Sequence, residues 1–222
     1  MTKNTRSKED LTKNPKLVIF DFDGVLFDSL NTVWKIIKPF IKKHGFTKVK
    51  NKQDFRKLFI TNFYTATEHL GFDICHTPEL HNEIMNIMET NYDPPIFLGI
   101  TKIIKKLAQR CTLAVESSNY ESAMRRILKA HDLEKYFTFI AGADKEPSKT
   151  KRLQNLLQNV RPAAALFVTD TVGDISEAKK AGIPSIAVSW GYHTYRQLKK
   201  AHPLDTARTP EELVKKIKDY FG

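Results

Sequence analysis

The chain has 222 residues, 41% of them hydrophobic, which suffices for one α/β core carrying a modest insertion. No apolar run is long enough to span a bilayer, and residues 1–15 lack the apolar segment of a signal peptide, so we expect a disordered lead-in and no membrane partner. The formal net charge is +11, but the lysines are dispersed along the chain without interleaved aromatic residues, which favours a solvated basic surface over a nucleic-acid partner.

Five short apolar runs bounded by turn residues predict strands that are buried on both faces. From residue 98 onward these runs alternate with segments of helical spacing, the last of which ends at Gly182. Alternating strands and helices predict an α/β domain with a parallel sheet and right-handed crossovers. The predicted strands are 17–20, 111–115, 137–140, 164–168 and 185–188, and the predicted helices are 101–110, 121–129, 151–159 and 174–181.

The stretch between the first two predicted strands has a different pattern. Residues 31–93 contain segments with helical spacing of apolar residues and no convincing strand. Pro94 and Pro95 then form a stiff return to the α/β part. We therefore expect residues 31–93 to form an all-helical cap, inserted into a core made of residues 16–30 and 94–222. Two cysteines, at no metal-ligand spacing, indicate a reducing compartment and hence a cytoplasmic location.

Four carboxylates follow two of the predicted strands. Asp21 and Asp23 come directly after the first strand and, as residues i and i+2 of an extended segment, point the same way. Asp170 and Asp174 follow the fourth strand, and Asp174 is partly explained as a helix cap. If the two strands are neighbours, the acids meet at the sheet edge where α/β folds bind ligands, and charges about 4 Å apart repel by about 4 kcal/mol at an effective dielectric of 20. The cluster therefore predicts a cation, and oxygen ligands alone favour Mg²⁺.

Hydroxyl groups and a lysine follow the second and third predicted strands. Ser117, Ser118 and Asn119 precede a helix, where hydroxyls and backbone N–H groups can bind a phosphate. Lys149 follows the third strand, where its ammonium could neutralise charge shared by a phosphate and Asp21. Taken singly, these groups have structural explanations as helix caps or a surface lysine. Their common position, directly after buried strands at one edge of one sheet, favours a phosphate site.

These residues resemble the haloacid dehalogenase superfamily. The run Phe20–Ser29, with the sequence FDFDGVLFDS, resembles its first motif, Ser117 fits the second, Lys149 the third, and Asp170 with Asp174 the fourth. Residues 174–184 and the run Trp190-Gly191-Tyr192 resemble the subgroup that contains phosphoglycolate phosphatases and β-phosphoglucomutases. The resemblance covers residues 16–222 and is closer in the core than in the insertion.

The resemblance implies a Rossmann-like core with the first strand in its centre and a helical cap after the first motif. It implies that Asp21 is a nucleophile that forms an aspartyl-phosphate, and that Asp23 is the general acid and then the general base. It implies Mg²⁺ bound by the Asp21 carboxylate, the Asp23 backbone carbonyl and Asp170, with Asp174 close by. Dehalogenases, phosphonatases and P-type ATPases of the superfamily lack an acid at the position of Asp23, which therefore points to a phosphatase or a phosphomutase.

Two features depart from the family pattern or leave it ambiguous. Glu116 stands where relatives usually have an apolar or small residue, so it could weaken phosphate binding or contact hydroxyl groups of the substrate. Lys145 could replace Lys149 in the third motif. We prefer Lys149, because a helix start would fix it at the sheet edge, whereas Lys145 has Asp144 and Glu146 beside it as surface partners.

The function that follows is hydrolysis of a small phosphorylated metabolite. A phosphomutase of the β-phosphoglucomutase kind would form the same intermediate and is the first alternative. A non-catalytic basic binding module is the second, although the intact set of motifs argues against it. The identity of the substrate and the oligomeric state stay open. Cap residues that are candidates for determining specificity are Arg56, Lys57, Tyr64 and His69.

Overall fold

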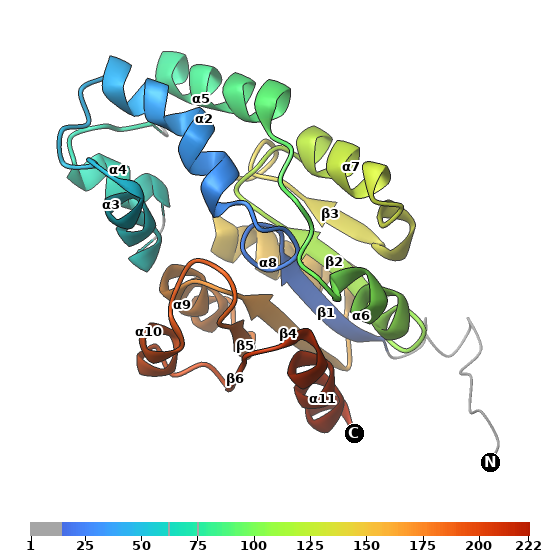
Figure 1. The fold of residues 1–222 in the computed structure, drawn as a ribbon. Coiled ribbons are helices and arrows are strands. Elements are labelled where there is room, and N and C mark those ends of the chain that lie inside the picture. The colour runs from blue at the N-terminus through green and yellow to red at the C-terminus, as the bar shows by residue number, and fades with distance from the viewer. Residues whose placement is uncertain (1–14, 62, 75) are drawn as a thin grey trace.

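The computed structural model describes residues 15–61, 63–74 and 76–222 (Figure 1). Its centre is a six-stranded sheet in the order β3-β2-β1-β4-β5-β6, in which every neighbouring pair is parallel. The first strand lies inside the sheet, as its continuous apolar sequence requires. The strands are β1 (Lys16–Asp21), β2 (Thr112–Glu116), β3 (Phe139–Ala141), β4 (Ala164–Thr169), β5 (Ser185–Val188) and β6 (Asp205–Ala207).

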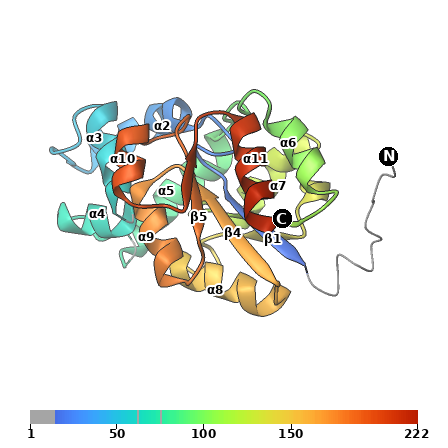
Figure 2. The same ribbon diagram turned by 90° about the horizontal axis from the view of Figure 1, so that it is seen from below.

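Side chains of β1 alternate between two apolar cores. Val18 and Phe20 pack with helices α6, α7 and α11, whereas Leu17 and Ile19 pack with α8 and α9. Figure 2 shows α8 and α9 on the opposite side of the strands from α6 and α11. The predicted fold class, an α/β protein with a Rossmann-like parallel sheet, is confirmed. The helices of this part are α6 (Ile100–Leu107), α7 (Glu121–Ala130), α8 (Lys149–Val160), α9 (Val172–Lys180), α10 (Tyr195–Lys200) and α11 (Pro210–Phe221).

All five predicted strands are present, but their ends differ from the prediction and the sheet has a sixth strand. The third strand begins at Phe139 rather than at residue 137, because the N–H of Phe137 still bonds back into a short 3-10 helix, η2 (Glu134–Tyr136). The sixth strand was not predicted, since Asp205–Ala207 contains only one apolar residue. It nevertheless pairs with β5 in register, which completes the sheet.

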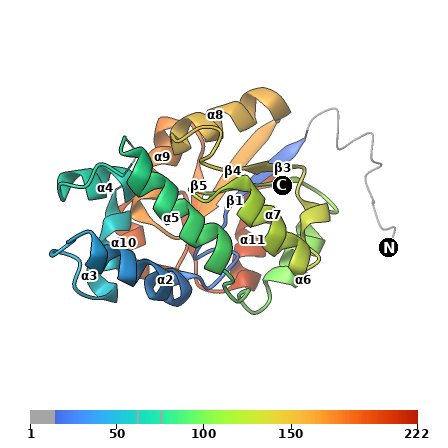
Figure 3. The same ribbon diagram turned by 90° about the horizontal axis from the view of Figure 1, so that it is seen from above.

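Between β1 and α6, the described residues form helices and, apart from isolated β-bridges, no strands. Figures 1 and 3 show these helices gathered at the end of the sheet where the strands finish. Their buried faces carry apolar side chains, among them Ile37 on one helix and Met88 on another. The division of the chain at residues 31 and 93 stays a prediction. The helices are α2 (Leu30–Lys43), α3 (Lys52–Lys57), the 3-10 helix η1 (Leu58–Ile60), α4 (Phe63–His69) and α5 (Pro78–Asn91).

The remaining structural predictions concern membrane-spanning segments and the N-terminal lead-in. In the described ranges, no helix combines the length and the apolar composition needed to cross a membrane. The lead-in predicted for residues 1–15 lies outside the described residues except for Pro15.

Candidate active site

The first acidic pair lies where β1 ends and the chain turns sharply. Asp21 is the last residue of β1, and Phe20 pairs in register with Val168 of β4. Gly24 follows with a φ of +71°, a conformation that L side chains rarely adopt. A Cβ added there would lie 1.9 Å from Oδ2 of Asp170. The glycine therefore lets the turn after β1 pass directly over the carboxylate that follows β4.

The Asp21 carboxylate is buried and faces a lysine. Its Oδ1 accepts a hydrogen bond of 2.8 Å from the Phe22 N–H, and its Oδ2 lies 3.4 Å from Nζ of Lys149. Burial raises the pKa of Asp21 well above its usual value; the charge of Lys149 opposes this shift, and the neighbouring Asp174 adds to it. Asp21 is thus held in a fixed position beside a cation at the centre of the sheet edge.

The Asp23 carboxylate accepts hydrogen bonds from several side chains. Its Oδ2 accepts from Nδ2 of Asn119 at 2.7 Å and from Oγ of Ser117 at 3.3 Å, and its Oδ1 accepts from the hydroxyl of Tyr92. Burial raises the pKa of Asp23, against hydrogen bonds from Ser29, Tyr92 and Ser117 that lower it. Ser117 and Asn119, predicted to bind phosphate, therefore also orient Asp23.

Tyr92 was not identified from the sequence. Its side chain is completely buried just after α5, in the segment that returns to the core. Burial raises the pKa of its hydroxyl well above the usual value, and the negative charge of Asp23 adds to this. Its position before Asp93 and two prolines does not indicate a role in the site, because a tyrosine there could equally well pack inside the cap.

The Asp170 side chain is buried beneath the turn that follows β1. Its Oδ2 accepts a hydrogen bond of 2.5 Å from the Tyr192 N–H, while Oδ1 has no hydrogen-bond partner in the described part of the chain. Burial raises the pKa of Asp170 to about 8, against the bond from Tyr192, and the charges of Asp174 and Asp23 add to the rise. An unpaired buried carboxylate is costly unless a cation lies beside it. The residues thus fit the hard cation expected from oxygen ligands.

The fit to a metal rests on the oxygen ligands that the site offers, not on a complete set of protein ligands. In the described residues, no group of three or more His, Cys, Asp or Glu side chains is arranged to hold a metal ion by itself. Mg²⁺ does not require such a group, because it usually keeps several waters and takes one or two carboxylates together with phosphate oxygens.

Asp174 does not cap its helix, which corrects the explanation based on the sequence. Helix α9 begins at Val172, and the side chain of Thr171 caps it by accepting the Asp174 N–H at 3.2 Å. The Asp174 carboxylate is therefore available to accept 3.0 Å bonds from Lys149 and from the Thr169 hydroxyl. Burial would raise the pKa of Asp174, but Lys149 and hydrogen bonds to Asp21 and Thr169 lower it to about 2.

Lys149 and Lys145, the two candidates for the third motif, lie in different surroundings. Lys149 is the first residue of α8 and is buried, with Nζ 3.0 Å from Asp174 and 3.1 Å from Glu116. These acids and Asp21 hold the pKa of Lys149 well above its usual value although burial lowers it. The Lys145 side chain is 71% exposed and pairs with Glu121, not with Asp144 or Glu146 as expected. Only Lys149 therefore reaches the acidic cluster.

Glu116 has a structural partner that the sequence did not reveal. Its side chain is fully buried, and its Oε1 accepts a 2.7 Å bond from Nε of Arg152. Arg152 also donates hydrogen bonds to the carbonyls of Glu146 and Pro147, and these bonds fix the loop before α8. Glu116 is absent from the cavity lining in the described residues, so the suggestion that it contacts substrate hydroxyls is not supported.

Arg152→Ala is expected to lower the free energy of unfolding by about 3–5 kcal/mol, because it leaves the Glu116 charge buried with only Lys149 beside it. Chemical denaturation measures the change. Lys151→Ala, at an exposed position of the same helix, is the matched control. Adding Glu116→Gln to Arg152→Ala should restore part of the loss. Equal stability of the two single variants would show that the buried pair contributes little.

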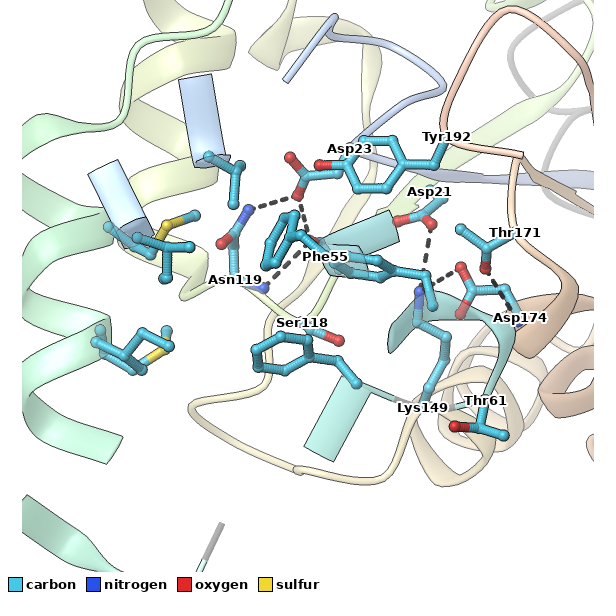
Figure 4. A pocket seen from close by; sticks show the side chains of 18 residues that line it. Asp21, Asp23, Phe55, Thr61, Ser118, Asn119, Lys149, Thr171, Asp174 and Tyr192 are labelled. Atoms are coloured by element: carbon cyan, nitrogen blue, oxygen red, sulfur yellow. Dashed lines mark hydrogen bonds and ion pairs between the residues drawn. The ribbon is translucent and has the colours of Figure 1, made fainter. Parts of the chain in front are cut away.

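A cavity of about 110 Å³ lies between the strand ends and the helices above them (Figure 4). Asp21, Asp23, Lys149 and Asp174 line it from the core, together with Ser117, Ser118 and Asn119 after β2. The predicted catalytic and phosphate-binding residues are therefore brought together in one place. Asp170 lies beneath the turn at Gly24 and is not part of the lining.

The helical insertion closes over this cavity through α3 and η1. Arg56 donates to the backbone carbonyl of Tyr192, and the ring of Phe59 meets that of Tyr192 edge-on at 4.9 Å. Arg56 thus contacts the core backbone, while the other described specificity candidates, Lys57 and His69, are exposed. Arg56, Lys57 and His69 do not line the cavity, and the side chain of Tyr64 lies outside the described part.

Comparisons with known proteins agree with this geometry. A profile of the haloacid dehalogenase-like hydrolase family matches residues 18–188. The chain is similar to phosphoglycolate phosphatases of Synechococcus elongatus (26% identity over 90% of this chain and 96% of that protein) and Aquifex aeolicus (25% identity, 93% and 98%). A structure of a predicted phosphatase from Clostridium acetobutylicum shares the fold, with a TM-score of 0.80 at 24% identity over 93% of this chain and 100% of that one. The chain therefore belongs to the haloacid dehalogenase-like hydrolases and is a phosphatase of that family.

Proposed function

We propose that the chain is a Mg²⁺-dependent phosphomonoesterase that acts on a small phosphorylated metabolite through a phosphoryl group transferred to Asp21. The observation that carries the proposal is the position of Asp21, buried in the cavity with its Oδ2 3.4 Å from the ammonium of Lys149. A carboxylate next to a fixed cation can approach a phosphate dianion without the full repulsion between two anions.

In the first step a carboxylate oxygen of Asp21 attacks phosphorus, and the bond from phosphorus to the alcohol oxygen breaks. Asp23 gives a proton to the departing alcohol. In the second step Asp23 takes a proton from a water molecule, whose oxygen attacks phosphorus and releases phosphate and the Asp21 carboxylate. The hydrogen bonds from Asn119, Ser117 and Tyr92 support this role, because they hold the Asp23 carboxyl in one orientation.

The phosphate oxygens would be bound by the groups that follow β2 and by the first residue of α8. Ser117 and Ser118 supply hydroxyls, and Lys149 supplies a positive charge. Mg²⁺ would be held by Asp21, the backbone carbonyl of Asp23 and Asp170, with Asp174 close by, and it supplies further positive charge toward the phosphate. The unpaired oxygen of Asp170 supports this assignment.

Metal removal tests the proposal. Hydrolysis of p-nitrophenyl phosphate should fall to background in excess chelator and return on addition of Mg²⁺, because the acidic cluster requires a cation to accept a phosphate. Phosphate release is the measurement, and the same protein dialysed against Mg²⁺-containing buffer is the control. Full activity in excess chelator would contradict the metal assignment while leaving the family membership intact.

A further inference from the structure

The cavity has a polar floor and an apolar roof. The floor consists of the strand-end groups that include Asp21, Ser117 and Lys149. The roof comes from the helical insertion and, apart from Thr61, its described lining consists of aliphatic, aromatic and thioether side chains (Figure 4). The roof side chains used below are Val33 and Ile37 of α2, Phe55 of α3, Phe59 of η1, and Met85 and Met88 of α5.

Among the described lining residues, none in the roof carries a positive charge. Of the described residues that line the cavity, Lys149 alone has a cationic side chain, and it already lies within 3.4 Å of three carboxylates. Arg56 is turned to the Tyr192 carbonyl instead.

The charge distribution restricts what can accompany the phosphate. The floor can take one dianion, because Lys149 and the expected cation both lie there. A second negative group on the same substrate would have to enter the roof, where it would lose its water and find no counter-charge. Hydroxyl groups of a sugar would also meet few partners, because Thr61 is the only roof residue in the described lining with a polar side chain.

The shape of the roof favours a compact apolar group. The Phe55 and Phe59 rings meet edge-on at 5.3 Å, which gives a rigid aromatic wall. Met85 and Met88 lie on α5, and methionine side chains adapt to irregular apolar ligands.

Resting on the proposed phosphatase function, we infer that the substrate is a phosphomonoester of a small, uncharged, mainly apolar alcohol or phenol, and not a phosphorylated carboxylic acid such as phosphoglycolate. The apolar roof around Phe55, Phe59, Met85 and Met88 binds the leaving group, while the floor binds the phosphate. The roof thereby sets the chain apart from the activity for which its curated relatives are named. It also disfavours the phosphomutase alternative, since a sugar would have to rebind within an apolar roof.

A pair of matched esters tests this inference. Isobutyl phosphate and phosphoglycolate have nearly the same shape, since an isopropyl group replaces the carboxylate. In wild-type protein with Mg²⁺, kcat/KM should be at least about a hundredfold higher for isobutyl phosphate, because the carboxylate would be buried unpaired. A ratio near one, or in favour of phosphoglycolate, would overturn the inference and leave the phosphatase function standing.

A charge introduced into the roof should change the preference. Met88→Lys places an ammonium where the second substrate group lies, so it should shift the ratio at least about tenfold toward phosphoglycolate. Asn86→Lys adds the same charge to the exposed side of the same helix and should leave the ratio as in wild type. An equal shift in both variants would show that overall charge, rather than the roof, sets the preference.

Failure of the proposed function would look different. If no phosphomonoester, including p-nitrophenyl phosphate, is turned over in a way that depends on Asp21, the phosphatase mechanism is wrong. Binding then still decides the inference about the roof. Isobutyl phosphate should raise the melting temperature of Asp21→Asn more than phosphoglycolate does at the same concentration. The opposite order would overturn the inference without any reference to turnover.

Discussion

Asp21→Asn is expected to abolish turnover of every phosphomonoester that the wild-type chain hydrolyses. An amide oxygen is a poor nucleophile and cannot carry the phosphoryl group as an acyl phosphate, so kcat should fall at least about a thousandfold. The substitution is nearly isosteric, and the amide oxygen can still accept the Phe22 N–H that now bonds to Oδ1 of Asp21. Phosphate release under Mg²⁺ saturation measures the loss.

The control for this prediction is an equally conservative change in the segment that follows β1. Asp28→Asn lies seven residues later at an exposed position, and it should retain the wild-type rate. Melting temperatures of both variants establish that they fold. Mass spectrometry of rapidly quenched wild-type enzyme should detect a phosphoryl adduct that Asp21→Asn lacks. Near wild-type turnover by Asp21→Asn would mean that the phosphoryl group never resides on this residue.

The sheet and the carboxylates at its edge could be predicted, because each is indicated by a short stretch of sequence. Asp21 ends a run of four buried apolar residues, and Asp170 follows the buried strand β4, so each carboxylate is placed by its own strand. Parallel pairing of β1 with β4 then brings the two strand ends together. By contrast, β6 is three residues long and is recognisable only through its pairing with β5, which no local pattern reveals.

The residues that sequence reasoning missed act through contacts between distant segments. In the sequence, Arg152 resembles the other basic residues of a helix whose buried face carries Leu153 and Leu156. Its bond to Glu116 joins positions 36 residues apart. Tyr92 reaches Asp23 across 69 residues. The apolar roof is another case, because Phe59 and Met88 have no distinguishing pattern in the sequence and line the cavity only when the helices fold over the strand ends.

Lys149→Ala is expected to lower kcat/KM at least about a hundredfold, whereas Lys145→Ala should change it only mildly. A hundredfold loss corresponds to about 2.7 kcal/mol of barrier, which is within the range for removing a group that stabilises charge in a transition state. The Lys149 ammonium is buried among three carboxylates, of which Asp21 and Asp174 line the cavity. Lys145 is a matched control with the same side chain four residues earlier, paired with Glu121 at the surface.

A second variant separates lost charge from lost packing at this position. Lys149→Met keeps most of the side-chain volume beside the Phe167 ring, over which Nζ now lies 5.7 Å from the ring centroid. If the ammonium acts on the phosphate, Lys149→Met should lose as much kcat/KM as Lys149→Ala, with a smaller loss of melting temperature. Recovery of activity in Lys149→Met would assign the effect to packing. A larger loss in Lys145→Ala than in Lys149→Ala would mean that the third motif is carried by Lys145, and that the cluster around Lys149 serves the stability of the sheet edge rather than the reaction.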